Sequence, residues 1–362
     1  MQKEIGSSFW LPPGSVSGFP RRSKKSPAIL NAGENYLSTC RSAIGIILDS
    51  ISSRRKVAIA PAFTCESVLS PFVKRGYVVE PYPIGLDLSI NWDGFKEKVN
   101  SFKPSVILLH SYFGFNTIKG VEDYFLKLRQ QGTILIDDMT QSMFSSYRPL
   151  RANYYVGSIR KWMSLPDGAF VTVPLGYSVI NEDDVLVEAK VRAMEEKGNW
   201  ILNGVGDKAT FRQSLANAER ILDSRDNTYL MSSVSRELYA ATDIEKMKEV
   251  RRLNYSYLES NIWEDDKLSE VLTPIMPQIS DEVCPFHFPV LVRENRNDLQ
   301  QYLAANDIYA TIIWSIPEVF KNKINEIARY VYDHILCFHV DQRYTSEDMK
   351  RIVDTLKQYY TN

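Results

Sequence analysis

From about residue 40 to residue 175, short runs of apolar and β-branched residues alternate with longer stretches of helical periodicity. Parallel strands need crossover connections, so this alternation predicts a mostly parallel sheet with helices on both faces. Helices are expected between several of the strands, for example at 41–51 and 121–132. The expected strands are VAIAPA (57–62), YVVEPYP (77–83), SVILLHSY (105–112), TILIDD (133–138), YYVGSI (154–159) and AFVTV (169–173).

The pattern changes after about residue 175, where three long, charged helices are expected at 182–197, 211–225 and 243–261. A final section reads as a compact α+β module. Its expected strands are 286–293, 309–315 and 334–340, and its expected helices are 297–308 and 346–360. We therefore expect three parts: an N-terminal arm (1–35), a large domain (36–245) and a small C-terminal α+β domain (246–362).

The composition limits the kinds of molecule that the protein is expected to bind. The net charge is −1 and 24% of the residues are charged, which argues against nucleic acid or a membrane surface as the main partner. No apolar run approaches the roughly 18 residues that a membrane span needs, and the first residues lack the apolar core of a secretion signal. We expect a cytoplasmic protein with small-molecule substrates and no metal site, because the cysteines are scattered without zinc-ligand spacing: Cys40, Cys65, Cys284 and Cys337.

Polar residues follow three of the expected strands. Ligands of α/β sheets sit beyond the carboxyl ends of the strands, so these positions are where binding and catalytic residues are expected. The residues are Asp137 and Asp138 in ILIDDMTQ, His110 and Tyr112 in LLHSYFG, and Ser158 and Lys161 in YYVGSIRKW.

A fourth feature is the helix start in STCRSAIGIIL, where hydroxyls and backbone N–H groups can seat an anion. Each feature has a simpler interpretation on its own. The helix start is ordinary capping, a strand-end aspartate is a turn residue, His110 is a structural histidine, and Lys161 is a surface side chain beside Trp162. The occurrence of all four in one α/β segment favours a site with an anion seat, a buried carboxylate and a lysine.

These segments together resemble those of a known enzyme class. CRSAI, HSYFG, IDDMTQ and SIRKWMSLPDG, in that order, resemble fold-type I pyridoxal-phosphate (PLP) enzymes, most closely the DegT/DnrJ/StrS-type sugar aminotransferases. The resemblance covers about residues 35–175 by motif and the rest by element order. It implies a mostly parallel seven-stranded sheet between helices, with a smaller C-terminal α+β domain. The Ser-x-x-Lys spacing is closer to the cysteine-desulfurase branch of the same fold.

The resemblance also implies roles for individual residues. Lys161 would form the internal aldimine with pyridoxal 5′-phosphate and move the substrate proton, and Asp138 would pair with the pyridinium nitrogen. Gln141 would lie near the phenolic oxygen of the cofactor. The phosphate would be held by Ser42, Ala43 and Ser158, with Arg41 or Arg160 as a source of added charge. The implied cofactor-binding residues are Arg41, Ser42, Ala43, Cys65, His110, Asp138, Gln141, Ser158 and Lys161.

The sequence departs from the family pattern in three places. Cys65 stands where sugar aminotransferases carry an aromatic residue against the cofactor, so the stacking ring would come from Phe63 or Tyr112. Cys40 replaces a glycine before the phosphate turn. The last strand, ILCFHV, lacks an arginine for a substrate α-carboxylate, and Arg343 lies just beyond it. The last departure favours a keto sugar on a carrier nucleotide as acceptor, with glutamate as donor.

We therefore expect an aminotransferase of polysaccharide biosynthesis, acting as a homodimer with a shared active site. The partner subunit's contribution is expected from the loop around 203–208 and from the basic segment 21–25. Two alternatives remain open. One is a PLP-dependent lyase, desulfurase or dehydratase. The other is a non-catalytic binding protein derived from the fold, against which the presence of both Lys161 and Asp138 speaks.

Overall fold

The computed structural model describes residues 4–19, 28–30, 33–118, 120, 122–147, 151–173, 177–180, 182–225, 227–276 and 278–361. The chain forms two compact units. The first contains Ser8–Ser52 and Tyr154–Thr242, and the second contains Gln2–Ser7, Ser53–Asn153 and Asp243–Asn362. The division into an arm, a large domain and a small domain stays a prediction.

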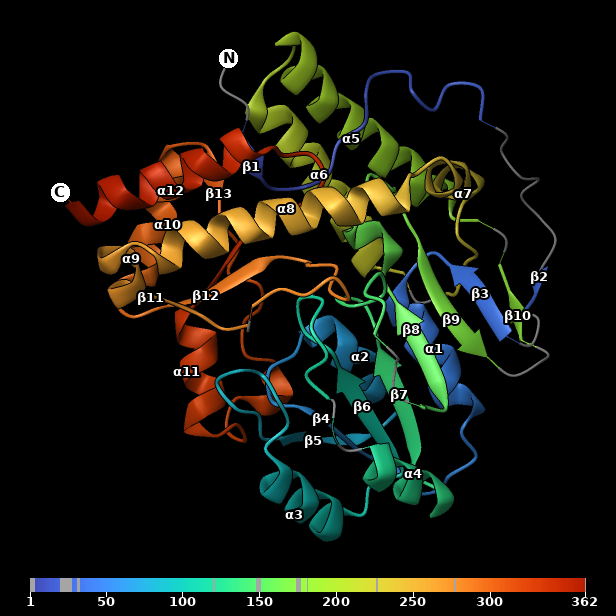
Figure 1. The fold of residues 1–362 in the computed structure, drawn as a ribbon. Coiled ribbons are helices and arrows are strands. Elements are labelled where there is room, and N and C mark those ends of the chain that lie inside the picture. The colour runs from blue at the N-terminus through green and yellow to red at the C-terminus, as the bar shows by residue number, and fades with distance from the viewer. Residues whose placement is uncertain are drawn as a thin grey trace. The chain divides into compact units, whose positions relative to one another are not determined.

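Four parallel strands form the sheet of the second unit, in the order β7–β6–β4–β5. The strand β6 is buried at every residue, as expected for a parallel strand with helices on both faces. Helices follow β4, β5 and β6 as crossovers (Figure 1). The elements are β4 (Val57–Pro61), α2 (Glu66–Lys74), β5 (Val78–Tyr82), α3 (Trp92–Phe102), β6 (Val106–His110), α4 (Glu122–Gln130) and β7 (Ile134–Asp138).

Three antiparallel strands form the sheet of the first unit, in the order β3–β9–β8. With the four parallel strands they make up the seven strands of the central sheet, which confirms the predicted α/β fold class. The strands are β3 (Gly33–Leu37), β8 (Tyr154–Gly157) and β9 (Ala169–Val173), and helix α1 (Cys40–Ser50) packs against β8 and β9. The strand β3 was not predicted, because GENYL is short and mostly polar.

The helix α5 of the first unit ends later than the sequence suggested, and α6 begins and ends earlier. The helix α5 covers Asp184–Asn203 and α6 covers Lys208–Asp223, and they lie side by side in Figure 1. Gly204 ends α5 in the left-handed conformation and Asp207 caps α6, so the predicted loop at 203–208 is a short irregular connection between two helices. The unit also contains α7 (Ser233–Ala240), and a short strand β2 (Ala28–Ile29) pairs with β10 (Ser178–Val179).

The C-terminal part of the second unit is an α+β module around an antiparallel sheet in the order β11–β12–β14. A short N-terminal strand, β1 (Ile5–Gly6), pairs with β13 (Ile308–Tyr309). The elements are α8 (Ile244–Trp263), α9 (Asp266–Val271), β11 (Leu272–Pro274), β12 (Phe288–Val292), α10 (Arg296–Ala305), α11 (Glu326–His334), β14 (Ile335–Phe338) and α12 (Ser346–Thr361).

The predicted strand at 309–315 is wrong beyond Tyr309. The chain there makes a single bridge, between Thr311 and Cys337, and then leaves the sheet. Thr311 pairs with the edge of β14 opposite β12, and the residues after it do not continue this ladder. Its side chains, including Trp314, pack against other parts of the unit instead.

In the described part of the chain, no helix combines the length and the apolar character that crossing a bilayer requires.

Candidate functional site

The carboxylate of Asp138 is buried at the end of β7, with 2% of the residue exposed. Its Oδ1 accepts a hydrogen bond from the backbone N–H of Thr140 at 2.9 Å, and its Oδ2 lies 3.6 Å from Nδ1 of His110. His110 ends β6 and is the direct register partner of Asp138, which explains the proximity of the two side chains. The structure places Asp138 and His110 at strand ends, as expected from the sequence, and their roles in binding a cofactor stay predictions.

The imidazole of His110 is held by groups from two other segments and by Tyr112, two residues further along its own. Its Nε2 lies 2.8 Å from Oγ1 of Thr64, just after β4. The ring stacks on the indole of Trp314, with centroids 6.2 Å apart and an interplanar angle of 27°, and meets Tyr112 edge-on. Neither Thr64 nor Trp314 was predicted as a contact of His110, although Cys65 next to Thr64 was, because both residues reach His110 only through the tertiary fold.

The loop after β4 is itself fixed by Tyr332 from α11. The Tyr332 hydroxyl accepts from the backbone N–H of Thr64 at 2.9 Å and lies 3.0 Å from the carbonyl oxygen of the same residue. Cys65, the next residue, is the N-cap of α2 and is half-buried, with its Sγ 3.0 Å from Oγ of Ser67. The position of Cys65 is therefore set by a rigid helix start.

The two rings proposed to replace the missing aromatic residue lie in the core. Phe63 has no exposed surface and packs against Trp314, Tyr332 and Tyr112. Tyr112 is 2% exposed, and its hydroxyl donates to the carbonyl oxygen of Phe63. Both rings support the strand ends from below, and Phe63 presents no open face to a ligand.

Gln141 is also buried beside these strand ends. Its Oε1 accepts a hydrogen bond from the backbone N–H of Phe113 at 2.9 Å, which ties the loop after β7 to the loop after β6. The second unit thus brings together His110, Asp138 and Gln141, as the sequence predicted, with Cys65 in the adjoining loop.

The first unit holds the remaining predicted residues. Strand β8 runs into a single turn of 3-10 helix at Ile159–Lys161, which begins after Ser158 and places Lys161 at its end. Ser158 is buried and Lys161 is half-buried. The backbone N–H of Arg160 donates to the carbonyl oxygen of Gly168, so the SIRKWMSLPDG segment closes on itself.

Lys161 lies in a cluster of cationic side chains around Glu219 of α6. Lys190 and Arg160 both form ion pairs with Oε1 of Glu219, the second at 3.5 Å. Burial alone would raise the pKa of Glu219, but Arg160, Lys190 and Lys161 hold that pKa below its ordinary value. Three cations around one carboxylate leave net positive charge, which favours an anion such as phosphate.

The start of α1 has the residue types expected of an anion seat, with its polar groups engaged internally. Thr39 caps the helix by accepting from the backbone N–H of Ser42 at 3.1 Å, and the two hydroxyls lie 2.8 Å apart. The N–H of Ala43 donates to the carbonyl oxygen of Thr39, and Arg41 pairs with Asp223 at 2.8 Å. The phosphate-binding roles of Arg41, Ser42 and Ala43 stay predictions.

Arg343, considered above as a binding group for a substrate carboxylate, forms an ion pair within the protein. Its guanidinium forms a bidentate pair with Asp341, with both N···O distances at 2.8 Å. Burial alone would raise the pKa of Asp341, but Arg343 holds it well below its usual range. This pairing stabilises the loop after β14 and occupies the carboxylate-binding fork of Arg343.

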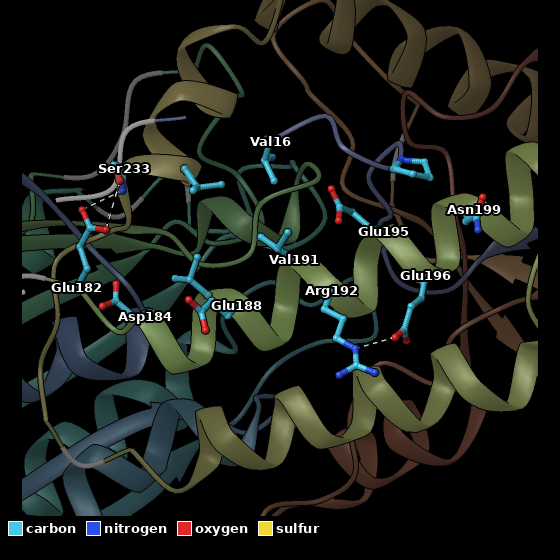
Figure 2. Close-up of a pocket in the computed structure, with 13 residues that line it drawn as sticks. Val16, Glu182, Asp184, Glu188, Val191, Arg192, Glu195, Glu196, Asn199 and Ser233 are labelled. Carbon is cyan, nitrogen blue, oxygen red and sulfur yellow. Dashed lines mark hydrogen bonds and ion pairs between the residues drawn. The ribbon is translucent and has the colours of Figure 1, made fainter. Parts of the chain in front are cut away.

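A groove of about 370 Å³ runs along α5 in the first unit (Figure 2). Its lining includes five carboxylates and one guanidinium, spread over the length of the helix. Such a negative surface repels phosphate, so the groove is a poor candidate for a phosphate-bearing ligand. The lining residues are Pro13, Val16, Glu182, Asp184, Val187, Glu188, Val191, Arg192, Glu195, Glu196, Asn199, Ser233 and Val234.

Over the residues that the structure describes, no cluster of three or more His, Cys, Asp or Glu side chains could hold a metal ion. None of the four cysteines forms a disulfide.

The neighbour of Asp138 on β7 gives a prediction for stability. Burial, with a smaller contribution from Asp138, raises the pKa of Asp137 from 3.8 to about 7. The folded protein therefore keeps this proton up to about pH 7, whereas the unfolded chain loses it near pH 4. The free energy of unfolding should fall by about 3 kcal/mol between pH 5 and pH 8 on account of this group.

Asp137→Asn should remove this pH dependence, which urea unfolding at pH 5 and pH 8 would measure. The exposed Asp93→Asn serves as control and should follow the wild type. Equal pH dependence in Asp137→Asn and the wild type would contradict the shifted pKa.

No family model matches the sequence, and no curated protein matches it. Solved structures do match. A sugar aminotransferase, CalS13 from Micromonospora echinospora, is 15% identical with a TM-score of 0.64, covering 90% of this chain and 87% of that one. Helicobacter pylori PseC, an aminotransferase involved in the biosynthesis of pseudoaminic acid, is 13% identical with a TM-score of 0.65, covering 91% and 86%.

A DegT DnrJ EryC1 StrS aminotransferase from Brucella abortus is 13% identical, with a TM-score of 0.63 and the same coverage of 91% and 86%. These matches span nearly the whole of each chain. At this level of identity they show that the chain has the aminotransferase fold.

Proposed function

We propose that this protein is a PLP-dependent aminotransferase that transfers an amino group, with glutamate as donor, to a keto sugar nucleotide or a related carbonyl compound. The observation that best supports this proposal is the buried Asp138 carboxylate at a strand end of the aminotransferase fold. Lys161 supplies the amine that the chemistry requires, after β8 of the same fold. Sugar aminotransferases among the matched structures support the substrate class.

The residue types present fit pyridoxal 5′-phosphate. A buried carboxylate accepts hydrogen bonds only, and Asp138 is therefore suited to a protonated ring nitrogen. Ser158 offers a hydroxyl for the phosphate, within a unit whose Arg160 and Lys190 add positive charge. The hydroxyl and N–H groups at the start of α1 would contribute by exchanging their present bonds with Thr39 for bonds to the phosphate. Gln141 and His110 would contact the ring, and Cys65 would border it.

The bound cofactor would accept the electron pair left when the substrate loses a proton. Lys161 would hold the cofactor covalently through Nζ and would then carry the proton to and from the substrate carbon. Asp138 would keep the ring nitrogen protonated. The bond from Thr140 and the contact with His110 hold this carboxylate in one orientation, so it needs no rearrangement during the reaction.

Two observations support amino transfer to a sugar over the alternatives. Arg343 already forms a bidentate pair with Asp341, so it does not bind a substrate carboxylate. This is in line with an acceptor that carries no α-carboxylate. A desulfurase needs a cysteine in a mobile loop, whereas Cys65 is the N-cap of α2 beside Ser67.

We also propose a cytoplasmic homodimer with a shared active site. The end of α5 and the connection to α6 support this, because Leu202 and Val205 expose apolar side chains there that a partner subunit could cover. The basic segment 21–25, the other predicted contributor, lies outside the described residues.

The test is the visible absorbance of the purified protein mixed with pyridoxal phosphate, before and after borohydride reduction, followed by peptide mapping. We expect a yellow protein, and a single reduced adduct on Lys161. Added glutamate should then convert the absorbance of the unreduced protein to that of the aminated cofactor. A colourless protein, or adducts spread over exposed lysines, would overturn the proposal in favour of a non-catalytic protein of this fold.

A further inference from the structure

We propose that Trp314 is a positioning residue of the candidate site, acting by stacking its indole on the imidazole of His110. The geometric part of this inference concerns His110 alone, whereas its consequence for cofactor binding rests on the proposed function. Trp314 belongs to the irregular segment between β13 and α11, more than 200 residues after His110 in the sequence.

The contacts of Trp314 converge on the strand ends. Its ring stacks on His110 with an interplanar angle of 27°, lies 4.8 Å from the ring of Phe63, and lies 6.4 Å from that of Tyr112. These residues belong to the loop after β4 and to the end of β6 and the residues that follow it. One side chain from the C-terminal module therefore touches two of the three segments that carry second-unit candidates, the loop after β4 and the end of β6.

The stack complements the other restraints on His110. Oγ1 of Thr64 lies 2.8 Å from Nε2, and the ring of Tyr112 meets the imidazole edge-on. The indole of Trp314 adds a contact with the face of the imidazole, which turning the ring would disrupt. With both restraints in place Nδ1 stays directed at Asp138, 3.6 Å away. Since a carboxylate only accepts, the arrangement favours the His110 tautomer with the proton on Nδ1.

The position of Trp314 is not that of an ordinary core residue. Phe63 and Tyr112 are fully buried, whereas Trp314 is half-buried and lies outside any strand or helix. A large aromatic side chain that keeps exposed surface while stacking on a polar ring is suited to orienting that ring. We therefore expect its removal to affect the site more than the stability of the fold.

The experiment compares Trp314→Leu with Trp314→Phe. The first readout is the imidazole ¹⁵N signals of the protein without cofactor, where only four histidines contribute. The second is the affinity for pyridoxal phosphate by absorbance titration. Trp314→Leu should move the His110 signals away from the Nδ1–H tautomer and weaken cofactor binding by about threefold to tenfold, the range of an aromatic pair. Trp314→Phe keeps an aromatic face and should preserve both.

Trp92→Leu is the matched control. Trp92 also packs against several aromatic rings of the second unit, those of Phe95, Tyr124 and Phe125, but it belongs to α3 and contacts no candidate residue in the described structure. Its loss should lower stability while the His110 signals stay in place.

Unchanged His110 signals in Trp314→Leu would overturn the inference, as would a Trp314→Phe variant that behaves like the leucine variant. If Trp314→Leu does not fold, the ¹⁵N signals and the cofactor affinity are measured on Trp314→Met instead, with the same expected results. A wild-type protein that binds no cofactor would refute the proposed function and leave the ¹⁵N signals to decide the role of Trp314.

Discussion

Lys161→Ala should abolish amino transfer, lowering the rate of the glutamate half-reaction by at least about 10⁴-fold. The variant would lose both the amine that binds the cofactor and the base that moves the proton, and proton transfer alone contributes up to about 10⁴-fold. Ser158, the start of α1 and the cations around Glu219 would remain, so cofactor binding should weaken without vanishing. The measurement is a single-turnover absorbance change with glutamate.

Lys350→Ala provides the control, because that lysine is exposed on α12 and pairs only with a neighbouring surface carboxylate in the described structure. It should react at the wild-type rate. A Lys161→Ala variant that still turns over within about tenfold of wild type would show that another lysine carries the chemistry, and would refute the assignment of Lys161.

The sequence identified the strand-end residues because local pattern and topology suffice to place them. Buried apolar runs locate β6 and β7, and residues at the carboxyl ends of adjacent parallel strands must meet. The approach of His110 and Asp138 follows from this rule and is realised as a direct register pair. Lys161 likewise follows β8 after a short turn, as the Ser-x-x-Lys segment suggested.

The supporting residues could not be predicted in this way. Thr64, Trp314 and Tyr332 act on His110 or its neighbouring loop through contacts between segments far apart in the chain. The family resemblance includes Cys65, next to Thr64, but no motif surrounds Trp314 or Tyr332. The run that contains Trp314 even indicated a strand, because its β-branched residues have strand propensity whether or not a partner strand is present.

The hydrogen-bond and ion-pair partners of polar groups could not be predicted from the sequence either. A serine-rich helix start predicts an anion seat, yet Thr39 already satisfies the N–H groups of Ser42 and Ala43. Arg343 was considered for a substrate carboxylate although it lies beyond the last strand and out of register, and in the structure Asp341, two residues earlier, forms a bidentate pair with it. Side-chain hydrogen-bonding choices depend on distances that only the folded chain defines.

Gly114→Ala should destabilise the protein by about 3 to 5 kcal/mol, which is a large part of the stability of a typical domain. Gly114 closes the HSYFG segment with a φ of +98°. A Cβ there would lie 2.1 Å from the carbonyl oxygen of Cys284 and 3.1 Å from Cα of Pro285, and both obstacles are backbone atoms. The loop after β6 would have to move, and His110 and Gln141 are attached to it.

Gly132→Ala separates the two causes of this loss. Gly132 has a similar φ of +91° but open space where the Cβ would lie, so its substitution carries only the backbone strain of about 1 to 2 kcal/mol. Urea unfolding of both variants gives the difference directly. If Gly114→Ala lowers the free energy of unfolding no more than Gly132→Ala does, the segment around Cys284 moves easily. The close backbone contact would then not hold this loop in place.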